Sequence, residues 1–278
     1  RKQIWTIAYP ILISLLMENM IGLTDTAFLG RVGEVELGAS ALGSVYYLVI
    51  FMLGFGFGIG AQILIARRNG EKAYNLIGPL FQQGLLFLLS LAAVMFVISH
   101  TFTPMVLRSL ISSDEVYEAA VSYTNWRVFG FFFAFVAIMF RAFFVGITNT
   151  KTLTLNSIVM VLSNVVLNYV LVFGKLGLPA MGIAGAAIAS SASEMISMVF
   201  FIVYTRLRID HRKYGLFRFA GFSPKLLRGM LNVSVWTMIQ MFVAISTWFF
   251  FFIAVEHLGE RPLAVTNIIR SVSGIVFV

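Results

Sequence analysis

The feature that most constrains this chain is a series of long apolar runs, with charged residues gathered in the gaps between them. We predict seven complete runs and the start of an eighth: 5–29, 37–65, 76–99, 120–145, 153–173, 181–204, 231–255 and 263 to the end. Each complete run is close to or above the ~20 residues that a helix needs to cross a bilayer core of ~30 Å. Only 12% of the 278 residues are charged, whereas a water-soluble domain carries about 25%. The sequence therefore predicts an all-α membrane protein, a polytopic helical bundle.

The charges in the gaps are distributed unequally between the two sides of the membrane. Loops on the same side of the membrane as the N-terminus carry most of the basic residues, and seven of these lie between Arg206 and Arg228. Because such residues accumulate in cytoplasmic loops, we predict a multi-pass protein of the cytoplasmic (inner) membrane with its N-terminus in the cytoplasm. The net charge of +8 then reflects topology. We expect the lipid bilayer, and no nucleic acid, as a partner.

A weak internal repeat suggests how the chain is divided. A shift of 226 residues places Gly33-Glu34 on Gly259-Glu260 and the first run on the seventh. Six runs separate the copies, so the second copy enters the membrane in the same orientation, as in transporters built from parallel repeats. The chain starts without Met and stops inside an apolar run, so we expect a piece of a longer protein. The predicted parts are a six-helix lobe over 1–204, a basic inter-lobe loop over 205–230, and the truncated start of a second lobe over 231–278.

Acidic residues inside the first run are informative, because a charge near the bilayer centre costs on the order of 3 kcal/mol or more. Asp25 and Glu18 are seven residues apart, which places them on one helix face about two turns from each other. A carboxylate in a low-dielectric cavity can take up a proton and release it when a cation or substrate arrives. We predict this role for Asp25 and, secondly, for Glu18. The alternatives are a helix cap for Asp25, bonded to Thr24 or Thr26, and a structural bond to a neighbouring helix for Glu18.

Further polar residues lie in the fifth and sixth runs. Asn164 and Asn168 share one helix face and are candidates to complete a polar cluster around Asp25. The alternative is interhelical hydrogen bonding that only holds the bundle together. Glu194 is a second candidate proton carrier in the sixth run.

Three small or rigid residues are candidates for helix packing or gating. Gly56 and Gly60 have the four-residue spacing that allows two helices to approach closely, with a flexible point for rocking as the alternative. Pro10 in the first run predicts a kink that could act as a gating bend. Arg141, near one end of the fourth run, is expected to extend toward the membrane surface without a further role.

No arrangement of residues suggests an enzyme. The chain has no cysteine, its three histidines lack metal-binding spacing, and no phosphate-binding or nucleophile motif occurs. We therefore expect no catalytic residue, no metal site and no cofactor other than a coupling ion, H⁺ or Na⁺.

Several stretches resemble the multidrug and toxic-compound extrusion (MATE) transporters, and the resemblance covers essentially the whole chain. The stretches are Tyr9-Pro10, Asp25 to Gly30 with Gly33, Gly58 to Gly70, Arg141 to Lys151, and Asn164 to Ser190. The resemblance implies half of a two-lobe transporter with six spans in each lobe. It implies export of organic cations, drugs or other xenobiotics in antiport with H⁺ or Na⁺ by alternating access. We expect the transporter to be a monomer.

The resemblance also implies roles for single residues. Asp25 matches the acidic residue of the family's first helix, which binds the coupling ion, and Asn164 matches an Asn of the fifth helix. Ser190 stands where many members have Thr, and Asn168 where the DinF-like branch commonly has Asp. The seventh-helix Glu of the NorM-like branch has no counterpart, since 231–255 contains no acid. We hypothesise that Glu18 or Glu194 supplies the missing charge.

Two other functions fit the sequence less well. A lipid-linked oligosaccharide flippase of a related two-lobe fold would be favoured by a cavity lined with several Lys and Arg, and the apolar runs look poor in basic residues. A seven-helix receptor usually has its N-terminus outside, which the loop charges oppose.

Overall fold

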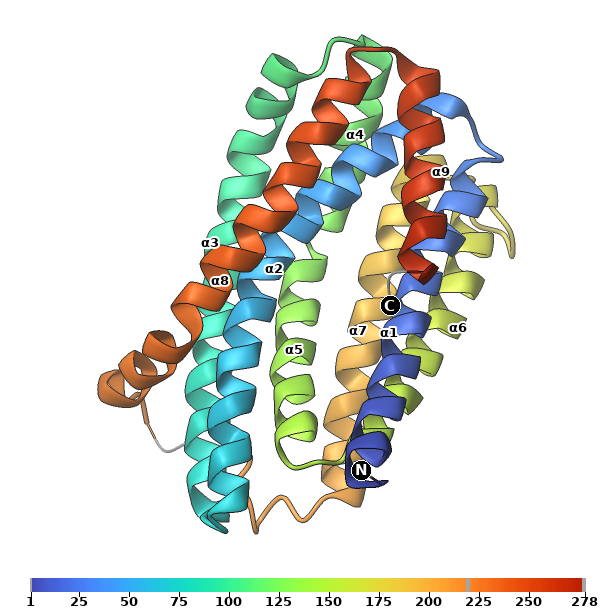
Figure 1. The fold of residues 1–278 in the computed structure, drawn as a ribbon. Helices are drawn as coiled ribbons and strands as arrows, with labels where there is room; N and C mark the ends of the chain where they lie inside the picture. The colour runs from blue at the N-terminus through green and yellow to red at the C-terminus, as the bar shows by residue number, and fades with distance from the viewer. Residues whose placement is uncertain (1, 219–220, 277–278) are drawn as a thin grey trace.

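The chain folds into a bundle of long helices that run between two opposite ends (Figure 1). The structure is a computed structural model that describes residues 2–218 and 221–276. Within these ranges it has nine α-helices and one 3-10 turn, Tyr74–Leu76. The helices are α1 (Lys2–Leu29), α2 (Glu34–Gly70), α3 (Ile77–Leu110), α4 (Asp114–Arg127), α5 (Gly130–Gly146), α6 (Lys151–Phe173), α7 (Gly182–Arg208), α8 (Pro224–Glu256) and α9 (Glu260–Val276).

The predicted all-α membrane bundle is confirmed, with one difference in the fourth span. In the described part of the chain, six helices are long and apolar enough to cross a membrane, and the pair α4–α5 makes a seventh span if it is counted as one. The run predicted over 120–145 as one helix is instead two, which meet at an angle of 50°. Arg127 ends α4 at this break and turns inward to a buried carboxylate on α7. A tertiary ion pair therefore coincides with the break, and a hydropathy pattern does not reveal such a pair.

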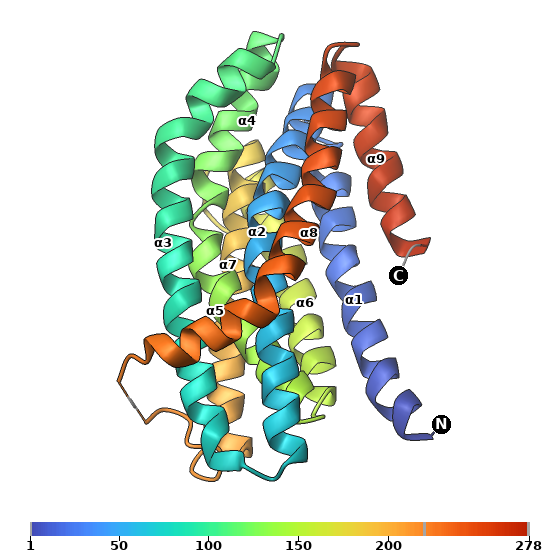
Figure 2. The ribbon, with the colours of Figure 1, turned by 60° about the vertical axis from the view of Figure 1, so that its left-hand side comes forward.

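Two sets of helices surround the interior of the bundle. In the first set α6 packs along both α1 and α7, and in the second α2 packs along α4 and α5 (Figure 1). The two helices at the end of the chain lie across these sets. Helix α8 makes its largest contact with α2, and α9 lies against α1 and α2, beside the half of α1 farther from the N-terminus (Figure 2).

The contact between α2 and α8 depends on glycine. A methyl group at Gly56 would lie 2.7 Å from Cα of Met238, and one at Gly60 would overlap Oγ of Ser234. The structure thus places both glycines at the close helix packing that their spacing indicates, and outside the cavity described below. Their part in gating stays a prediction.

We expect Gly56→Ala to destabilise the protein by about 1–3 kcal/mol, because the added methyl group meets backbone atoms of α8 that cannot rotate away. The measurement is thermal unfolding of the purified full-length protein. Gly229→Ala is the matched control, since no atom lies within 4 Å of the added methyl group there. Equal melting temperatures for the two variants would contradict this account of the contact.

The segment that joins α7 to α8 is shorter than predicted, covering 209–223 instead of 205–230. The difference arises at α8, where Ser223 caps the first turn by accepting from the Leu226 amide at 3.4 Å and Pro224 occupies the first position. Both residues favour a helix start, so α8 extends seven residues beyond the apolar run. The division of the chain into lobes stays a prediction.

Candidate functional site

A cavity of about 600 Å³ lies between seven of the helices, in the size range of small-molecule sites. Its walls come from α1, α2, α4, α5, α6, α7 and α9 and are mainly apolar. Six charged side chains of both signs also line it: Glu18, Asp25, Arg127, Arg141, Glu194 and Arg270. Within the described residues, five of these side chains belong to three separate polar groups around the cavity. Arg270 belongs to none of the three.

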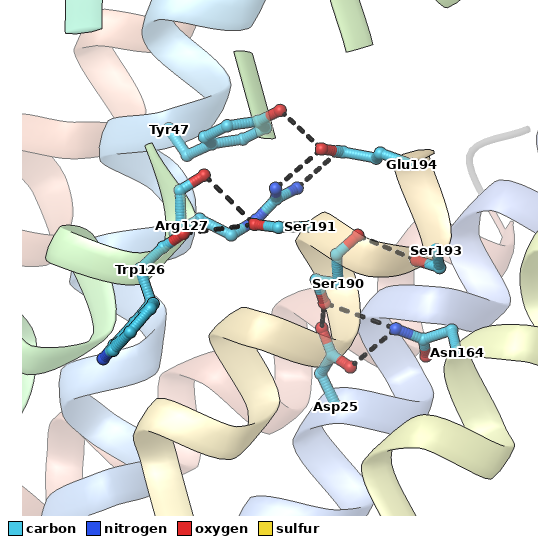
Figure 3. Close-up of polar contacts among 9 residues, drawn as sticks. All are labelled: Asp25, Tyr47, Trp126, Arg127, Asn164, Ser190, Ser191, Ser193 and Glu194. Atoms are coloured by element: carbon cyan, nitrogen blue, oxygen red, sulfur yellow. Dashed lines mark hydrogen bonds and ion pairs between the residues drawn. The ribbon is translucent and has the colours of Figure 1, made fainter. Parts of the chain in front are cut away.

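The first group surrounds Asp25 with neutral donors from two other helices. Asn168 donates to Oδ1 of Asp25 at 2.7 Å and Asn164 donates to the same oxygen at 3.4 Å, both from α6. Ser190 of α7 donates to Oδ2 at 2.8 Å (Figure 3). The structure therefore brings together the four residues that the sequence and the family resemblance singled out.

Asp25 does not cap its own helix. The hydroxyl groups of Thr24 and Thr26 donate instead to carbonyl oxygens one turn earlier in α1. The carboxylate of Asp25 thus points from α1 across to α6 and α7, where it lies at the cavity wall.

The second group is a buried ion pair between α4 and α7. Arg127 donates to both carboxylate oxygens of Glu194, at 2.8 and 2.6 Å, and Tyr47 donates to the same carboxylate at 2.9 Å (Figure 3). The Arg127 guanidinium also lies 3.5 Å from the centre of the Tyr47 ring. Gly130 leaves the room for this arrangement, because a methyl group there would overlap both charged groups.

The third group joins α1 to α5. Arg141 donates to Glu18 at 2.5 Å, and Ser14 links the same carboxylate to Ser157 of α6, at 3.3 and 2.6 Å. The expectation that Arg141 only extends toward the membrane surface was therefore wrong. Its side chain pairs with Glu18 at the cavity wall, where the ion pair satisfies both charges away from lipid.

The sequence interpretation missed part of this site. Arg127, Arg270 and Tyr47 were not among the candidate residues. The signal that identified Asp25, an ionisable residue within a span, applies equally to the two arginines. The apolar runs contain few basic residues, but three of these, Arg127, Arg141 and Arg270, line the cavity, so a low basic content of the runs does not predict a cavity without arginine.

Pro10 lies outside the cavity. Helix α1 continues through it, and its carbonyl oxygen accepts from the Thr154 hydroxyl of α6 at 2.9 Å. The structure therefore shows a contact to α6 at this position, and the gating role stays a prediction.

Comparison with known proteins identifies the family. A family model described as MatE matches residues 10–170, which is more than half of the chain. The chain belongs to the MATE family. MATE proteins are transporters and not enzymes, as the absence of a catalytic constellation led us to expect.

Curated and solved MATE proteins cover nearly all of this chain. A "probable multidrug resistance protein NorM" from Mannheimia succiniciproducens is 24% identical over 279 residues, covering 99% of this chain. The eukaryotic MATE transporter AtDTX14 superposes with a TM-score of 0.83 at 20% identity, and an inward-facing multidrug resistance MATE transporter with 0.78 at 20%. The chain spans 60% of the NorM protein and 61% and 64% of these two structures. At such identities the solved structures establish the fold alone.

Proposed function

We propose that the full-length protein is a secondary active efflux transporter, which exports organic cations and other drug-like molecules in exchange for H⁺ or Na⁺ by alternating access. One observation carries this proposal. Among the described residues, Asp25 is the only carboxylate at the cavity wall that has no arginine partner. A carboxylate held by neutral donors can exchange a cation, which is the property that ion coupling requires.

The two other carboxylates are less suited to this role. Glu194 and Glu18 each hold an arginine, and the adjacent guanidinium occupies the carboxylate and repels a second cation. We therefore assign coupling to Asp25 and a structural role to the two ion pairs. This replaces the hypothesis that Glu18 or Glu194 supplies a missing coupling charge.

The surroundings of Asp25 suit either coupling ion. Carboxylate, amide carbonyl and hydroxyl oxygens are the ligands that hard cations prefer, and Asn164, Asn168 and Ser190 supply the last two kinds. The Oδ1 atom of Asn168 is buried without a hydrogen-bond partner. Rotation of the Asn168 amide group by about 180° would direct that oxygen toward the Asp25 carboxylate, where Na⁺ would bind. A proton would bind to the carboxylate itself. To drive transport, the ion must bind the two states of the transporter with different affinity.

Aromatic rings beside the charged groups support an organic substrate. Tyr47, Phe51 and Phe55 follow one another along α2, with adjacent ring centroids 6.3 and 6.1 Å apart, and all three line the cavity. Stacked rings of this kind hold flat organic molecules, and their faces attract cations. The Tyr47 ring already contacts Arg127 and stacks with Phe131, with the ring centroids 4.8 Å apart. We propose that the substrate lies on the aromatic wall formed by Phe51 and Phe55, with Asp25 within reach.

The test is uptake of tetraphenylphosphonium, a cation with no proton of its own, into proteoliposomes containing the wild-type full-length protein. We expect uptake above protein-free vesicles under either an imposed proton gradient or an imposed sodium gradient, and none without a gradient. The gradient that drives uptake identifies the coupling ion. Accessibility of an N-terminal tag in intact cells would show whether the N-terminus faces the cytoplasm, as we propose, and mass determination in detergent would test the expected monomer.

A lack of gradient-driven uptake would contradict the proposal. It would favour the flippase alternative, for which the three cavity arginines are the relevant observation. We prefer the efflux transporter because two of those arginines are neutralised by glutamate and the chain belongs to the MATE family.

A further inference from the structure

One charged group in the cavity has no counter-charge in the described part of the chain. Arg270 of α9 donates from a single nitrogen, Nη2, to the Asn267 side chain at 3.0 Å and to the Ser44 hydroxyl at 3.5 Å. Its Nε is buried without a hydrogen-bond partner. Both hydrogen bonds are to neutral oxygens, and the guanidinium also lies 5.7 Å from the centre of the Phe252 ring, so no described carboxylate compensates the positive charge of Arg270.

The other two arginines of the same cavity show the contrast. Arg127 is bonded to Glu194 and Arg141 to Glu18, each through its guanidinium group. Burying an unpaired charge is costly, and native proteins usually pair such a charge or use it. Intramembrane charges that remain unpaired commonly mark a binding site or a transport pathway.

The helix that carries Arg270 is fixed against the rest of the cavity wall. Asn267, one turn earlier, is buried and donates to the Leu37 carbonyl of α2 at 3.0 Å. Ser271, the next residue, lies 2.8 Å from the Thr26 hydroxyl of α1, adjacent in sequence to Asp25. The guanidinium is thus held in place at the junction of α1, α2 and α9, and it lines the same cavity as Asp25 and the aromatic wall.

We propose that Arg270 binds a carboxylate group of the transported molecule. The preferred substrates are then aromatic amphiphiles that carry a carboxylate in addition to any cationic group. This inference rests on the proposed function, because it specifies the substrate class of the same cavity. A guanidinium with unused N–H donors binds a carboxylate through charge-assisted hydrogen bonds, which are about twice as strong as neutral ones.

The proposed division of the cavity follows from its three surfaces. The rings of Phe51 and Phe55 contact the aromatic body, Arg270 binds the carboxylate, and Asp25 remains for the coupling cation or for a basic group of the substrate. Because the Arg127–Glu194 and Arg141–Glu18 pairs are internally neutral, Arg270 is the group that discriminates between a substrate with a carboxylate and one without.

The test compares two dyes that differ in one group, a carboxyl rhodamine and its methyl ester. Their equilibrium binding to the full-length protein in detergent is measured by fluorescence anisotropy for the wild type and for Arg270→Gln. We expect the variant to weaken binding of the free acid about tenfold or more, the loss of one charge-assisted hydrogen bond. Binding of the ester should change less than about twofold. Arg270→Lys, which keeps the charge, should retain part of the preference.

A matched control separates a local contact from a general change in cavity charge. Arg141→Gln removes the same formal charge from the same cavity, but from a residue already paired with Glu18. A loss of free-acid binding in this variant as large as in Arg270→Gln would overturn the proposal, as would equal losses for acid and ester in Arg270→Gln.

Two further results would also overturn it. If Arg270→Gln cannot be purified as a folded protein, a wild type that binds the ester and not the free acid is sufficient to reject the inference. The same conclusion follows if Arg270→Lys weakens binding of the ester as much as binding of the free acid, because the side chain then does not discriminate between the two dyes. Failure of gradient-driven transport, by contrast, concerns the proposed function, since dye binding is measured at equilibrium without a gradient.

Discussion

Replacing Asp25 with Asn is expected to reduce gradient-driven uptake to the level of protein-free vesicles, while the protein remains folded. Asn has nearly the same shape as Asp: its carbonyl oxygen can accept from Asn168, and its amide can donate to the Ser190 hydroxyl, so the junction of α1, α6 and α7 is preserved. It cannot bind a proton or compensate Na⁺ with a negative charge. The measurement is tetraphenylphosphonium uptake in proteoliposomes, with size-exclusion profile and thermal unfolding as checks of folding.

Glu18→Gln is the matched control for this prediction. It removes a carboxylate from the same helix and the same cavity wall, but one that is held by Arg141 at 2.5 Å. We expect Glu18→Gln to retain gradient-driven uptake. If Glu18→Gln abolishes uptake and Asp25→Asn does not, coupling lies at the other end of the shared helix face, and our assignment is wrong.

The second large effect is expected at the buried ion pair. Arg127→Gln should destabilise the protein by roughly 3–5 kcal/mol, because it leaves Glu194 as an uncompensated charge in the interior. The side chains of Arg127 and Glu194 are 11% and 13% exposed, so water at the cavity wall compensates only part of the remaining charge. The double variant Arg127→Gln with Glu194→Gln should recover much of the loss, since it buries no charge. Thermal unfolding of the full-length variants measures both effects.

Arg141→Gln provides the comparison for this stability effect. The Arg141–Glu18 pair is 18% and 35% exposed, so solvent screens the carboxylate that remains after the substitution. We therefore expect a clearly smaller loss than for Arg127→Gln. A double variant at Arg127 and Glu194 that is no more stable than Arg127→Gln would show that the pair is held for reasons other than mutual neutralisation.

The sequence predicts those parts of the site that lie on one helix. Asn164 and Asn168 are four residues apart, and Glu18 and Asp25 are seven apart, so helical geometry places each pair on one face before any packing is known. That Asp25 meets the two asparagines was suggested by their shared polarity inside the membrane and by the family resemblance. The structure shows the contact at 2.7 and 3.4 Å.

Pairing between helices could not be predicted in the same way. The partners Arg127–Glu194 and Arg141–Glu18 are 67 and 123 residues apart, and which helix faces meet depends on how the bundle packs. The break between α4 and α5 has the same origin, because it coincides with this interhelical pair inside an otherwise apolar run. The early start of α8 was missed because a cap at Ser223 and a proline at the next position extend the helix beyond its apolar part.

The most direct test of the central claim is whether ligand binding displaces a cation from Asp25. Tetraphenylphosphonium is added to the full-length protein in weakly buffered detergent solution, and released protons are counted with a pH indicator. Bound radioactive Na⁺ is followed in a parallel sample. Our account predicts that the wild type releases a proton or Na⁺ as the ligand binds, and that Asp25→Asn binds the ligand and releases neither. Equal release from both proteins would contradict the assignment of Asp25 as the coupling site.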